Sequence, residues 1–343
     1  MYFSIIIPFL IAFLVTFFSI PYFEKFFSKI QIIATDMQKK LKPVIPLAGG
    51  IPVFFGFNLG VLSYVAINTF ILKNNVNLLY LFAAMLTSSI IAMIGFFDDI
   101  NVRSKRTYIG SGAVDFKVGL KQWQKALLPL IAAIPLMVVY AGATTISIPL
   151  LGALNFGILF PLVLIPLAVV FVSNATNMLA GLNGLEAGST AVALITLGFF
   201  TINSSPVAAI ISFTGAASLL AFLKFNWTPA RMLPGDSLTY FSGALIVSVV
   251  IVGGVERFGI IIFTPWIVEA FLKLRGGFKV RSYGDLQKDG TIKAPYDKIY
   301  SLTHFVMKLP EWLKIKRFTE KQITLILIGF EILICLLSLA YLH

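Results

Sequence analysis

N-A-T-N-M-L-A-G-L-N-G-L-E-A-G, residues 174–188, is a polar, glycine-rich stretch that lies between two long apolar runs. It contains three asparagines, Asn174, Asn177 and Asn183, and one charged residue, Glu186. An amide that is buried in hydrocarbon without a hydrogen bond costs roughly 2–7 kcal/mol, so these side chains must face protein, water or a ligand. We therefore interpret the stretch as the floor of a phosphate and metal site.

The chain on either side of this stretch is strongly apolar. Of the 343 residues, 58% are hydrophobic and only 12% are charged, and the mean hydropathy is +0.92. About ten apolar runs come near the ~20 residues that cross a bilayer. They are, approximately, 3–23, 47–70, 78–97, 126–142, 157–173, 187–203, 206–223, 238–255, 258–272 and 322–342. We predict an all-α polytopic membrane protein with about ten transmembrane helices, which forms a single integral membrane domain over residues 1–343.

The net charge of +12 follows membrane topology and does not indicate nucleic acid binding. Of the 27 Lys and Arg residues, all except Lys73 and Arg257 fall in the loops that follow the odd-numbered runs. By the positive-inside rule, these loops are cytoplasmic and both termini lie outside. Part of this charge can also attract anionic lipid or substrate phosphates. The single cysteine, Cys335, excludes a disulfide within one chain.

Two adjacent carboxylates, Asp98 and Asp99, end the third run on the predicted cytoplasmic side. Their mutual repulsion and the negative end of the helix dipole both oppose ionisation unless a cation lies nearby. A lysine, a Mg²⁺ ion or a proton would offset these effects. The alternative is a pair of solvated acids in a loop, although a plain helix end would more naturally carry Lys or Arg.

Each of the other polar residues also has an alternative to ligand binding. Asp236 follows the turn at Pro234 and starts a helix, where an acid is favoured even without a function. Glu186 has the same alternative as an N-terminal acid of the next helix. Asn174 and Asn177 could instead form hydrogen bonds between membrane helices.

The longest predicted cytoplasmic loop covers residues 273–321. It begins with the basic residues Arg275 and Arg281, and Asp289 with Gly290 predicts a hairpin turn. Over residues 299–313, apolar residues recur at spacings of three and four among lysines. This pattern predicts an amphipathic helix that lies on the cytoplasmic leaflet.

The candidate polar groups all belong to one predicted cytoplasmic face. Oxygen ligands from several loops suit Mg²⁺ or Mn²⁺, which usually bridges one or two carboxylates to substrate phosphates. Together with basic residues they favour phosphoryl transfer, in which positioning and charge neutralisation supply most of the rate. A site set in the membrane implies that one substrate is a lipid. A secondary transporter is the alternative class, but no internal repeat is visible and the polar clusters lie at helix ends.

Four spaced motifs cover most of the chain, from about residue 36 to residue 285. They are P-L-A-G-G-I-P at 46–52, D-D-I-N at 98–101, the central stretch at 174–188, and F-N-W-T-P-A-R-M-L-P-G-D-S at 225–237. Together they resemble the polyprenyl-phosphate N-acetylhexosamine-1-phosphate transferase family, and most of all its archaeal and eukaryotic branch. The resemblance implies a ten-helix fold.

The resemblance also implies a reaction: transfer of GlcNAc-1-phosphate from UDP-GlcNAc to dolichyl phosphate, with release of UMP, as the first step of lipid-linked oligosaccharide and N-glycan assembly. Another UDP-N-acetylhexosamine, or undecaprenyl phosphate as the acceptor, is the alternative within the same chemistry. Direct attack by the lipid phosphate and a covalent aspartyl intermediate are both compatible with the motifs.

The resemblance assigns roles to individual residues. It implies catalytic roles for Asp98, Asp99 and Lys125, and ligation of Mg²⁺ by Asn177 and Asp236. The expected substrate contacts are Asn101, Lys121, Asn174, Asn183, Glu186, Leu233, Arg275 and Arg281. The family has a lysine shortly before its fourth helix, and Lys121 is the alternative to Lys125 as its match. Leu233 occupies a position at which relatives usually have an aromatic residue.

Two departures separate the chain from bacterial relatives. Ala180 and Asn183 replace aspartates in the central motif, and residues 273–321 contain only His304 in place of a histidine cluster. We expect His304 to be a packing residue and not a ligand. Both departures argue against a role in peptidoglycan synthesis. The Ile, Lys and Asn content and the motif type predict a protein of an archaeal plasma membrane. We expect its active site to face the cytoplasm. The sequence does not decide between a monomer and a homodimer.

Overall fold

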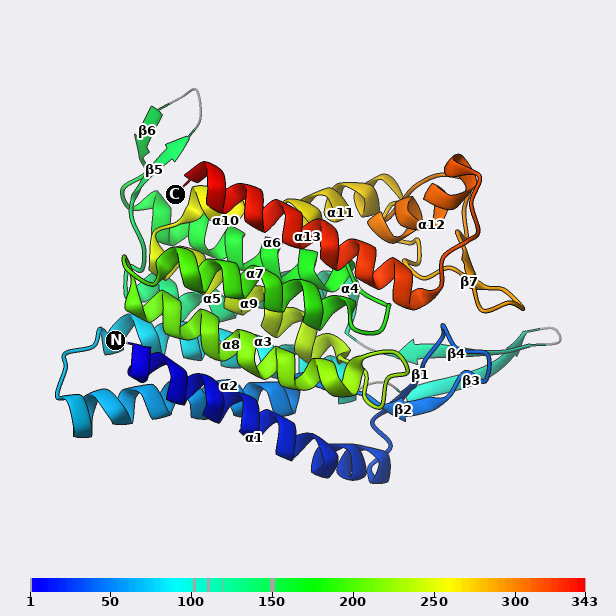
Figure 1. The fold of residues 1–343 in the computed structure, drawn as a ribbon, viewed down its shortest axis with the longest axis horizontal. Coiled ribbons are helices and arrows are strands. Elements are labelled where there is room, and N and C mark those ends of the chain that lie inside the picture. Colours follow the sequence, from blue (N-terminus) through cyan, green and yellow to red (C-terminus); the bar gives the residue numbers. More distant parts are fainter. Residues whose placement is uncertain (1, 101–102, 110–111, 119, 149–151, 343) are drawn as a thin grey trace.

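The apolar runs form long helices, because a helix satisfies its own backbone hydrogen bonds within hydrocarbon. The computed structural model describes residues 2–100, 103–109, 112–118, 120–148 and 152–342. Its helices run side by side along one direction, and the short strands lie at the two ends of the bundle (Figure 1).

Helices make up most of the chain. The α-helices are α1 (Tyr2–Lys29), α2 (Gly50–Ala66), α3 (Leu78–Ile100), α4 (Gln122–Leu127), α5 (Pro129–Val138), α6 (Ile165–Met178), α7 (Leu185–Thr201), α8 (Pro206–Asn226), α9 (Gly235–Gly253), α10 (Glu256–Ile262), α11 (Thr264–Arg275), α12 (Leu302–Leu313) and α13 (Glu320–Leu342). Short π-helical segments extend α2 over Ile67–Leu72 and precede α6 over Phe160–Leu164.

The strands form four separate antiparallel pairs. They are β1 (Ile33–Thr35) with β2 (Val44–Pro46), β3 (Arg103–Ile109) with β4 (Gly112–Val118), β5 (Thr145–Ile148) with β6 (Gly152–Asn155), and β7 (Asp285–Leu286) with β8 (Ile292–Lys293). The β7–β8 pair is the hairpin around Asp289 and Gly290, and α12 covers the amphipathic segment.

The prediction of a polytopic helical membrane protein is confirmed. Within the described residues, seven helices are long and apolar enough to cross a membrane. The other predicted runs, 126–142, 187–203 and 258–272, correspond to shorter helices: α4 with α5, α7, and the pair α10 and α11. The last pair is interrupted at Phe263, just before Pro265 at the start of α11.

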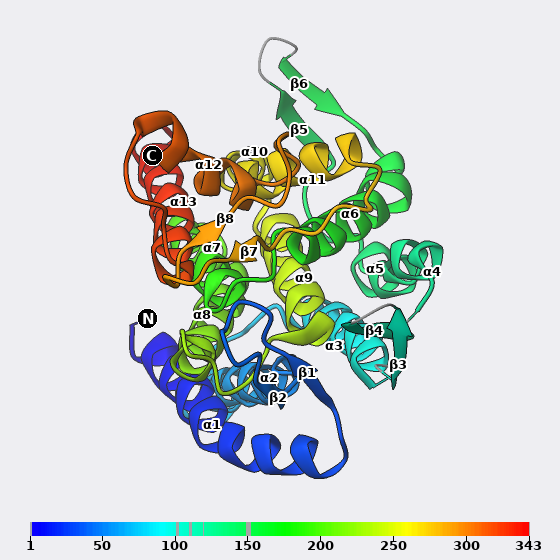
Figure 2. The same ribbon diagram turned by 90° about the vertical axis from the view of Figure 1, so that its right-hand side faces the viewer.

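The centre of the bundle is formed by α8 and α9. Each has 83% of its most apolar window buried inside the protein, against 33% for α1 and α13. Figure 2 looks along the helices and shows α9 among the others, with α1 and α13 at the periphery. Both α1 and α13 have their chain ends at one end of the bundle, whereas β1 to β4, β7 and α12 lie at the other (Figure 1). We name this second end the loop end.

Small residues allow the helices to approach closely, as is typical of membrane bundles. A Cβ atom on Gly56 of α2 would lie 1.9 Å from Thr16 Oγ1 and 2.6 Å from the carbonyl oxygen of Ala12, both on α1. At Gly329 of α13, by contrast, an added Cβ would meet no atom within 4 Å.

Gly56→Ala should therefore lower the free energy of unfolding by about 1–3 kcal/mol, because the added methyl group forces α1 and α2 apart. Gly329→Ala is the matched control and should not destabilise the protein. The measurement is the thermal unfolding midpoint of each variant in detergent. Equal midpoints for Gly56→Ala and the wild type would show that the α1–α2 contact is not as close as described.

Candidate active site

Four helices bring charged and amide side chains together at the loop end. The carboxyl end of α3 carries Asp98 and Asp99, and α4 carries Lys125. The last turns of α6 carry the asparagines of the central stretch, and α9 begins with Asp236 in its first turn. Their convergence agrees with the shared face expected from the sequence.

Lys125 lies between two carboxylates. Its Nζ is 2.5 Å from Asp98 Oδ2 and 2.8 Å from Asp236 Oδ2. Asp98 is fully buried, and its other oxygen accepts a hydrogen bond of 2.7 Å from the backbone N–H of Leu120. The lysine therefore supplies the positive charge that a buried carboxylate at a helix carboxyl end requires.

Asp99 contacts the start of α9. One carboxylate oxygen accepts from the N–H of Asp236 at 2.8 Å, and the other accepts from the N–H of Ser237 at 3.0 Å. These are N–H groups of the first turn of a helix, which have no partner within the helix. The neighbouring Gly235 has φ +70°, and a Cβ there would lie 2.3 Å from an Asp99 oxygen, so the junction requires glycine. The two adjacent aspartates thus have different contacts.

Hydroxyl groups of α9 face the two asparagines of α6. Thr239 Oγ1 donates to Asn177 Oδ1 at 3.0 Å. The Asn174 amide donates to the carbonyl of Val170 at 2.8 Å, and its oxygen is 3.5 Å from the Tyr240 hydroxyl. Sequence reasoning did not single out Thr239 and Tyr240. They lie three and four residues after Asp236, and this helical spacing was the signal that could have found them.

The residues fit a Mg²⁺ site that is completed by substrate. Within the described residues, no group of three or more His, Cys, Asp or Glu side chains could hold a metal ion. Mg²⁺, however, is commonly bound by one or two carboxylates together with substrate phosphates. Asn177 supplies an amide oxygen, which accepts a hydrogen bond from Thr239 on α9. Asp236 supplies a carboxylate and lies three residues before Thr239 on the same helix. Magnesium itself stays a prediction.

A cavity of about 860 Å³ opens beside these groups. Its polar lining includes Lys125, Asn174, Asn177, Tyr240, Lys273 and Arg281. It brings together expected residues from the second, third and last of the segments that the sequence predicts to be cytoplasmic. Lys273 lines the cavity although the sequence analysis did not select it.

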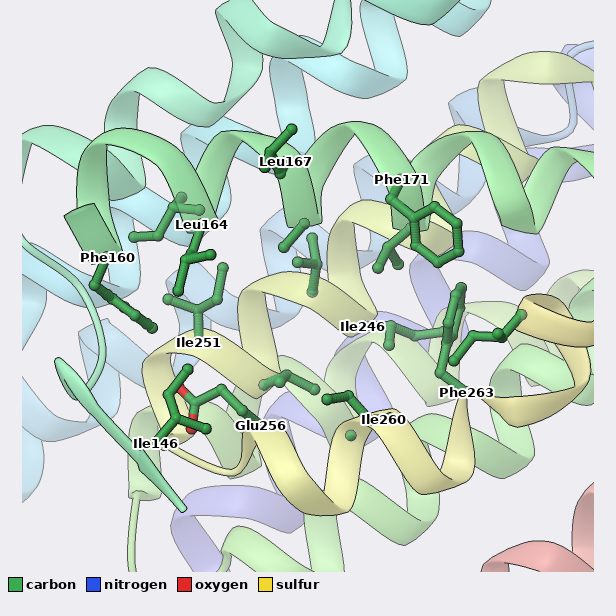
Figure 3. A pocket seen from close by; sticks show the side chains of 17 residues that line it. Ile146, Phe160, Leu164, Leu167, Phe171, Ile246, Ile251, Glu256, Ile260 and Phe263 are labelled. Carbon is green, nitrogen blue, oxygen red and sulfur yellow. The ribbon is translucent and has the colours of Figure 1, made fainter. Parts of the chain in front are cut away.

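An apolar groove of about 380 Å³ lies between α6, α9 and α10 (Figure 3). Phe160, Leu164, Ile246 and Ile260 are among its lining residues, and Glu256 is the one charged residue of its described lining. Leu167 and Phe171 of α6 line both this groove and the polar cavity. The two spaces therefore share part of the α6 surface as a common wall.

The structure places Asn183 away from the cavity. Its side-chain amide donates to Asp36 Oδ2 at 2.7 Å, and its backbone N–H donates to Glu320 Oε1 at 2.9 Å. Glu186 is buried and accepts from the backbone N–H of Gly181 at 2.7 Å. The second half of the central stretch is thus tied to the β1 region and to α13.

The remaining residues expected to contact substrate lie in different parts of the structure. Leu233 joins two motifs through its backbone, since its N–H donates to Pro46 and its carbonyl accepts from Gly49. Lys121 precedes α4, where its backbone N–H donates to the Gln124 side chain, and the Arg275 guanidinium lies 5.9 Å from the centre of the Tyr300 ring. Asn101 lies outside the described residues.

His304 is a buried packing residue within the segment 273–321, as expected. Burial, together with nearby Lys273, lowers the pKa of its ring to about 4. The neutral ring fits its contacts, because Nε2 lies 3.0 Å from the carbonyl oxygen of Arg281 and Nδ1 accepts from the N–H of Tyr300.

Comparisons with known proteins are consistent with this geometry. The profile of glycosyl transferase family 4 matches residues 81–254. A Saccharolobus solfataricus protein, provisionally named as a UDP-N-acetylglucosamine–dolichyl-phosphate N-acetylglucosaminephosphotransferase, is 36% identical over 339 residues, which are 98% of this chain and 96% of the relative. The Dictyostelium discoideum protein named for the same activity is 28% identical over 296 residues, 75% of this chain and 68% of its own. A Bacillus pumilus phospho-N-acetylmuramoyl-pentapeptide-transferase is 31% identical over 279 residues, 78% of this chain and 79% of its own.

Asp99→Ala should lower the free energy of unfolding by about 2 kcal/mol or more, because two buried N–H groups lose a charged acceptor. Asp289→Ala is the control: Asp289 also accepts from a backbone N–H, that of Thr291, but it is exposed and water can replace it. Thermal unfolding in detergent measures both. If Asp99→Ala unfolds at the same temperature as Asp289→Ala, Asp99 does not stabilise the start of α9.

Proposed function

The chain belongs to glycosyl transferase family 4, and from this membership we propose that it transfers GlcNAc-1-phosphate from UDP-GlcNAc to dolichyl phosphate. The products are GlcNAc-diphosphate-dolichol and UMP, and the reaction begins the assembly of a lipid-linked oligosaccharide for N-glycosylation. The names of the relatives from Saccharolobus solfataricus and Dictyostelium discoideum support the donor and the acceptor.

The observation that carries the proposal is that a charged cavity and an apolar groove lie next to each other and share two lining residues of α6. The cavity offers Lys125, Asn174 and Asn177, which suit phosphate groups. The groove offers almost wholly apolar walls, which suit a hydrocarbon chain. Because Leu167 and Phe171 line both spaces, one ligand can have its phosphate in the cavity and its first prenyl units in the groove.

The proposed reaction is a phosphoryl transfer. An oxygen of the lipid phosphate attacks the phosphorus that bears GlcNAc, and the bond from this phosphorus to the UMP oxygen breaks. Lys125 lies where it can neutralise phosphate charge, and Asp98 holds its ammonium in place. Asp99 fixes the first turn of α9 and, with it, Asp236. Bound to Asn177 and Asp236, Mg²⁺ or Mn²⁺ would neutralise the diphosphate and the leaving UMP.

The activity is tested by UMP release from UDP-GlcNAc and dolichyl phosphate with purified protein in detergent and Mg²⁺. Asp98→Asn, Asn177→Ala and Asp236→Asn should each lower kcat/KM about a hundredfold or more, because each removes charge or positioning at the reacting phosphates. Asp289→Asn, at an exposed hairpin turn, should keep the wild-type rate.

Each result of this assay has a distinct meaning. If the wild type releases UMP from another UDP-N-acetylhexosamine but not from UDP-GlcNAc, the chemistry stands and the proposed donor is wrong. If no UDP-sugar yields UMP, the transferase proposal fails. Trapping of a phosphorylated enzyme would favour a covalent aspartyl intermediate over direct attack by the lipid phosphate.

We place the loop end in the cytoplasm and the protein in the plasma membrane with about ten crossings. The basic residues support this orientation, since all but Lys73 and Arg257 fall in segments assigned to the cytoplasm. α1 begins and α13 ends at the same end of the bundle, which fits an even number of crossings (Figure 1).

Cysteine labelling tests the orientation, and the native Cys335 is buried. In intact cells, a membrane-impermeant maleimide should label Lys73→Cys, whereas Lys288→Cys should react only after the membrane is opened. The reverse pattern would place the active site outside the cell.

A further inference from the structure

The cavity has a wall that belongs to no helix or strand. Residues 276–284, which we name the covering loop, contribute Phe278, Val280, Arg281, Ser282 and Tyr283 to its lining. A loop without regular hydrogen bonding is mobile unless other groups fix it. Arg281 is, with Arg275, one of the two basic residues expected to contact the UDP-sugar, so the position of this loop affects how the donor is held.

Lys273 of α11 holds the covering loop in place. Its side chain is only 6% exposed, and its ammonium donates to the Ser282 hydroxyl at 2.6 Å and to the Val280 carbonyl at 3.1 Å. The third direction faces Glu269, one helical turn earlier on α11, with Nζ 3.8 Å from Oε1. Lys273 thus makes two hydrogen bonds to the covering loop and one ion pair with Glu269. Lys273 is therefore committed to the protein although it lines the cavity.

The same network reaches the helix that carries the two asparagines. The Ser282 hydroxyl, which accepts from Lys273, lies 3.3 Å from the carbonyl oxygen of Met178, to which it donates. Met178 is the last residue of α6 and follows Asn177 directly. The covering loop is thereby tied to the opposite wall of the cavity.

Glu269 extends the network to α12. It is fully buried, and its Oε2 accepts from the Leu302 N–H at 2.7 Å and from the Ser301 hydroxyl at 3.1 Å. From the start of α12, the Thr303 hydroxyl donates to the carbonyl of Ser282 at 2.5 Å. The loop is thus held from α6, α11 and α12 by buried polar groups.

Arg281 has a different environment. Its side chain is 39% exposed, and its partners are Asp285, four residues later in the chain, and the Tyr283 ring, which lies 5.2 Å from the guanidinium carbon. An exposed ion pair is worth little and exchanges easily. Arg281 can therefore turn toward an anionic donor, whereas Lys273 cannot turn away without losing its two hydrogen bonds to the covering loop.

We infer that Lys273 is a positioning residue: with Glu269 and Ser282 it holds the covering loop closed over the cavity, so that Arg281 meets the diphosphate of the UDP-sugar. This inference rests on the proposed function for the identity of the donor. The ordering of the loop itself is independent of that function.

The test is the kinetics of Lys273→Met in detergent, with UDP-GlcNAc and dolichyl phosphate varied in turn. The KM for UDP-GlcNAc should rise about ten- to a hundredfold, since misplacement of a contact by an ångström has effects of this size. The kcat and the KM for dolichyl phosphate should change less than about threefold. Lys288→Met removes the same charge at an exposed position of the hairpin turn and should match the wild type. Lys273→Arg should recover part of the lost donor affinity.

A merely structural role would give a different result. Partial unfolding lowers kcat through the fraction of active enzyme and leaves both KM values unchanged, and this outcome would overturn the inference. If Lys273→Met does not fold, Ser282→Ala carries the test, because it removes the link to Met178 without leaving a buried charge unpaired. A KM for UDP-GlcNAc within threefold of the wild type in the folded variant also overturns it.

Hydrogen exchange gives a readout that does not require activity. In Lys273→Met, the amides of residues 276–284 should exchange about tenfold faster than in the wild type, while those of α9 stay protected. If the wild type releases no UMP from any UDP-sugar, the proposed function fails and this measurement still decides whether Lys273 orders the loop. Unchanged exchange in the covering loop would show that it does not.

Discussion

The site depends on one ion cluster, in which the partly exposed Lys125 holds the buried Asp98 and the partly buried Asp236 at the loop end of the bundle. Removal of the lysine would leave the buried Asp98 carboxylate without a compensating charge, which destabilises the fold. The cluster therefore fixes α3, α4 and α9 relative to one another. Lys125 also lines the cavity, so the cluster places its two carboxylates behind that part of the cavity wall.

The adjacent aspartates show how one short motif can serve two purposes. Asp98 faces the lysine at the edge of the cavity, whereas Asp99 accepts the N–H groups of Asp236 and Ser237. Asp236 is the expected metal ligand. Its backbone N–H donates to the side chain of Asp99 on α3, and this contact holds Asp236 in place. A substitution of Asp99 would therefore alter the position of α9, and its expected catalytic role stays a prediction.

The sequence predicted the elements whose signals are local. Apolar runs predicted the helices, Asp289 with Gly290 predicted the β7–β8 hairpin, and residues 98–99, 125, 174, 177 and 236 were expected at one site and do converge. What could not be predicted depends on partners far away in the chain. Asn183 is bound by Asp36 and Glu320, which are 147 and 137 residues distant, and no local pattern shows such contacts. Lys273 was counted with the basic residues of a loop, because only the folded chain shows that it is buried.

The contact between α6 and α9 connects the two halves of the proposed substrate site. The Thr176 hydroxyl lies 2.8 Å from the carbonyl oxygen of Thr239, and a Cβ on Gly243 would come within 2.6 Å of the same hydroxyl. These two helices supply Asn174, Asn177 and Tyr240 to the polar cavity and Leu167, Phe171 and Ile246 to the apolar spaces. A shift of one helix along the other would therefore move the phosphate site and the hydrocarbon groove together. Small residues at this contact keep α6 and α9 close together, and this fixes the cavity and the groove relative to each other.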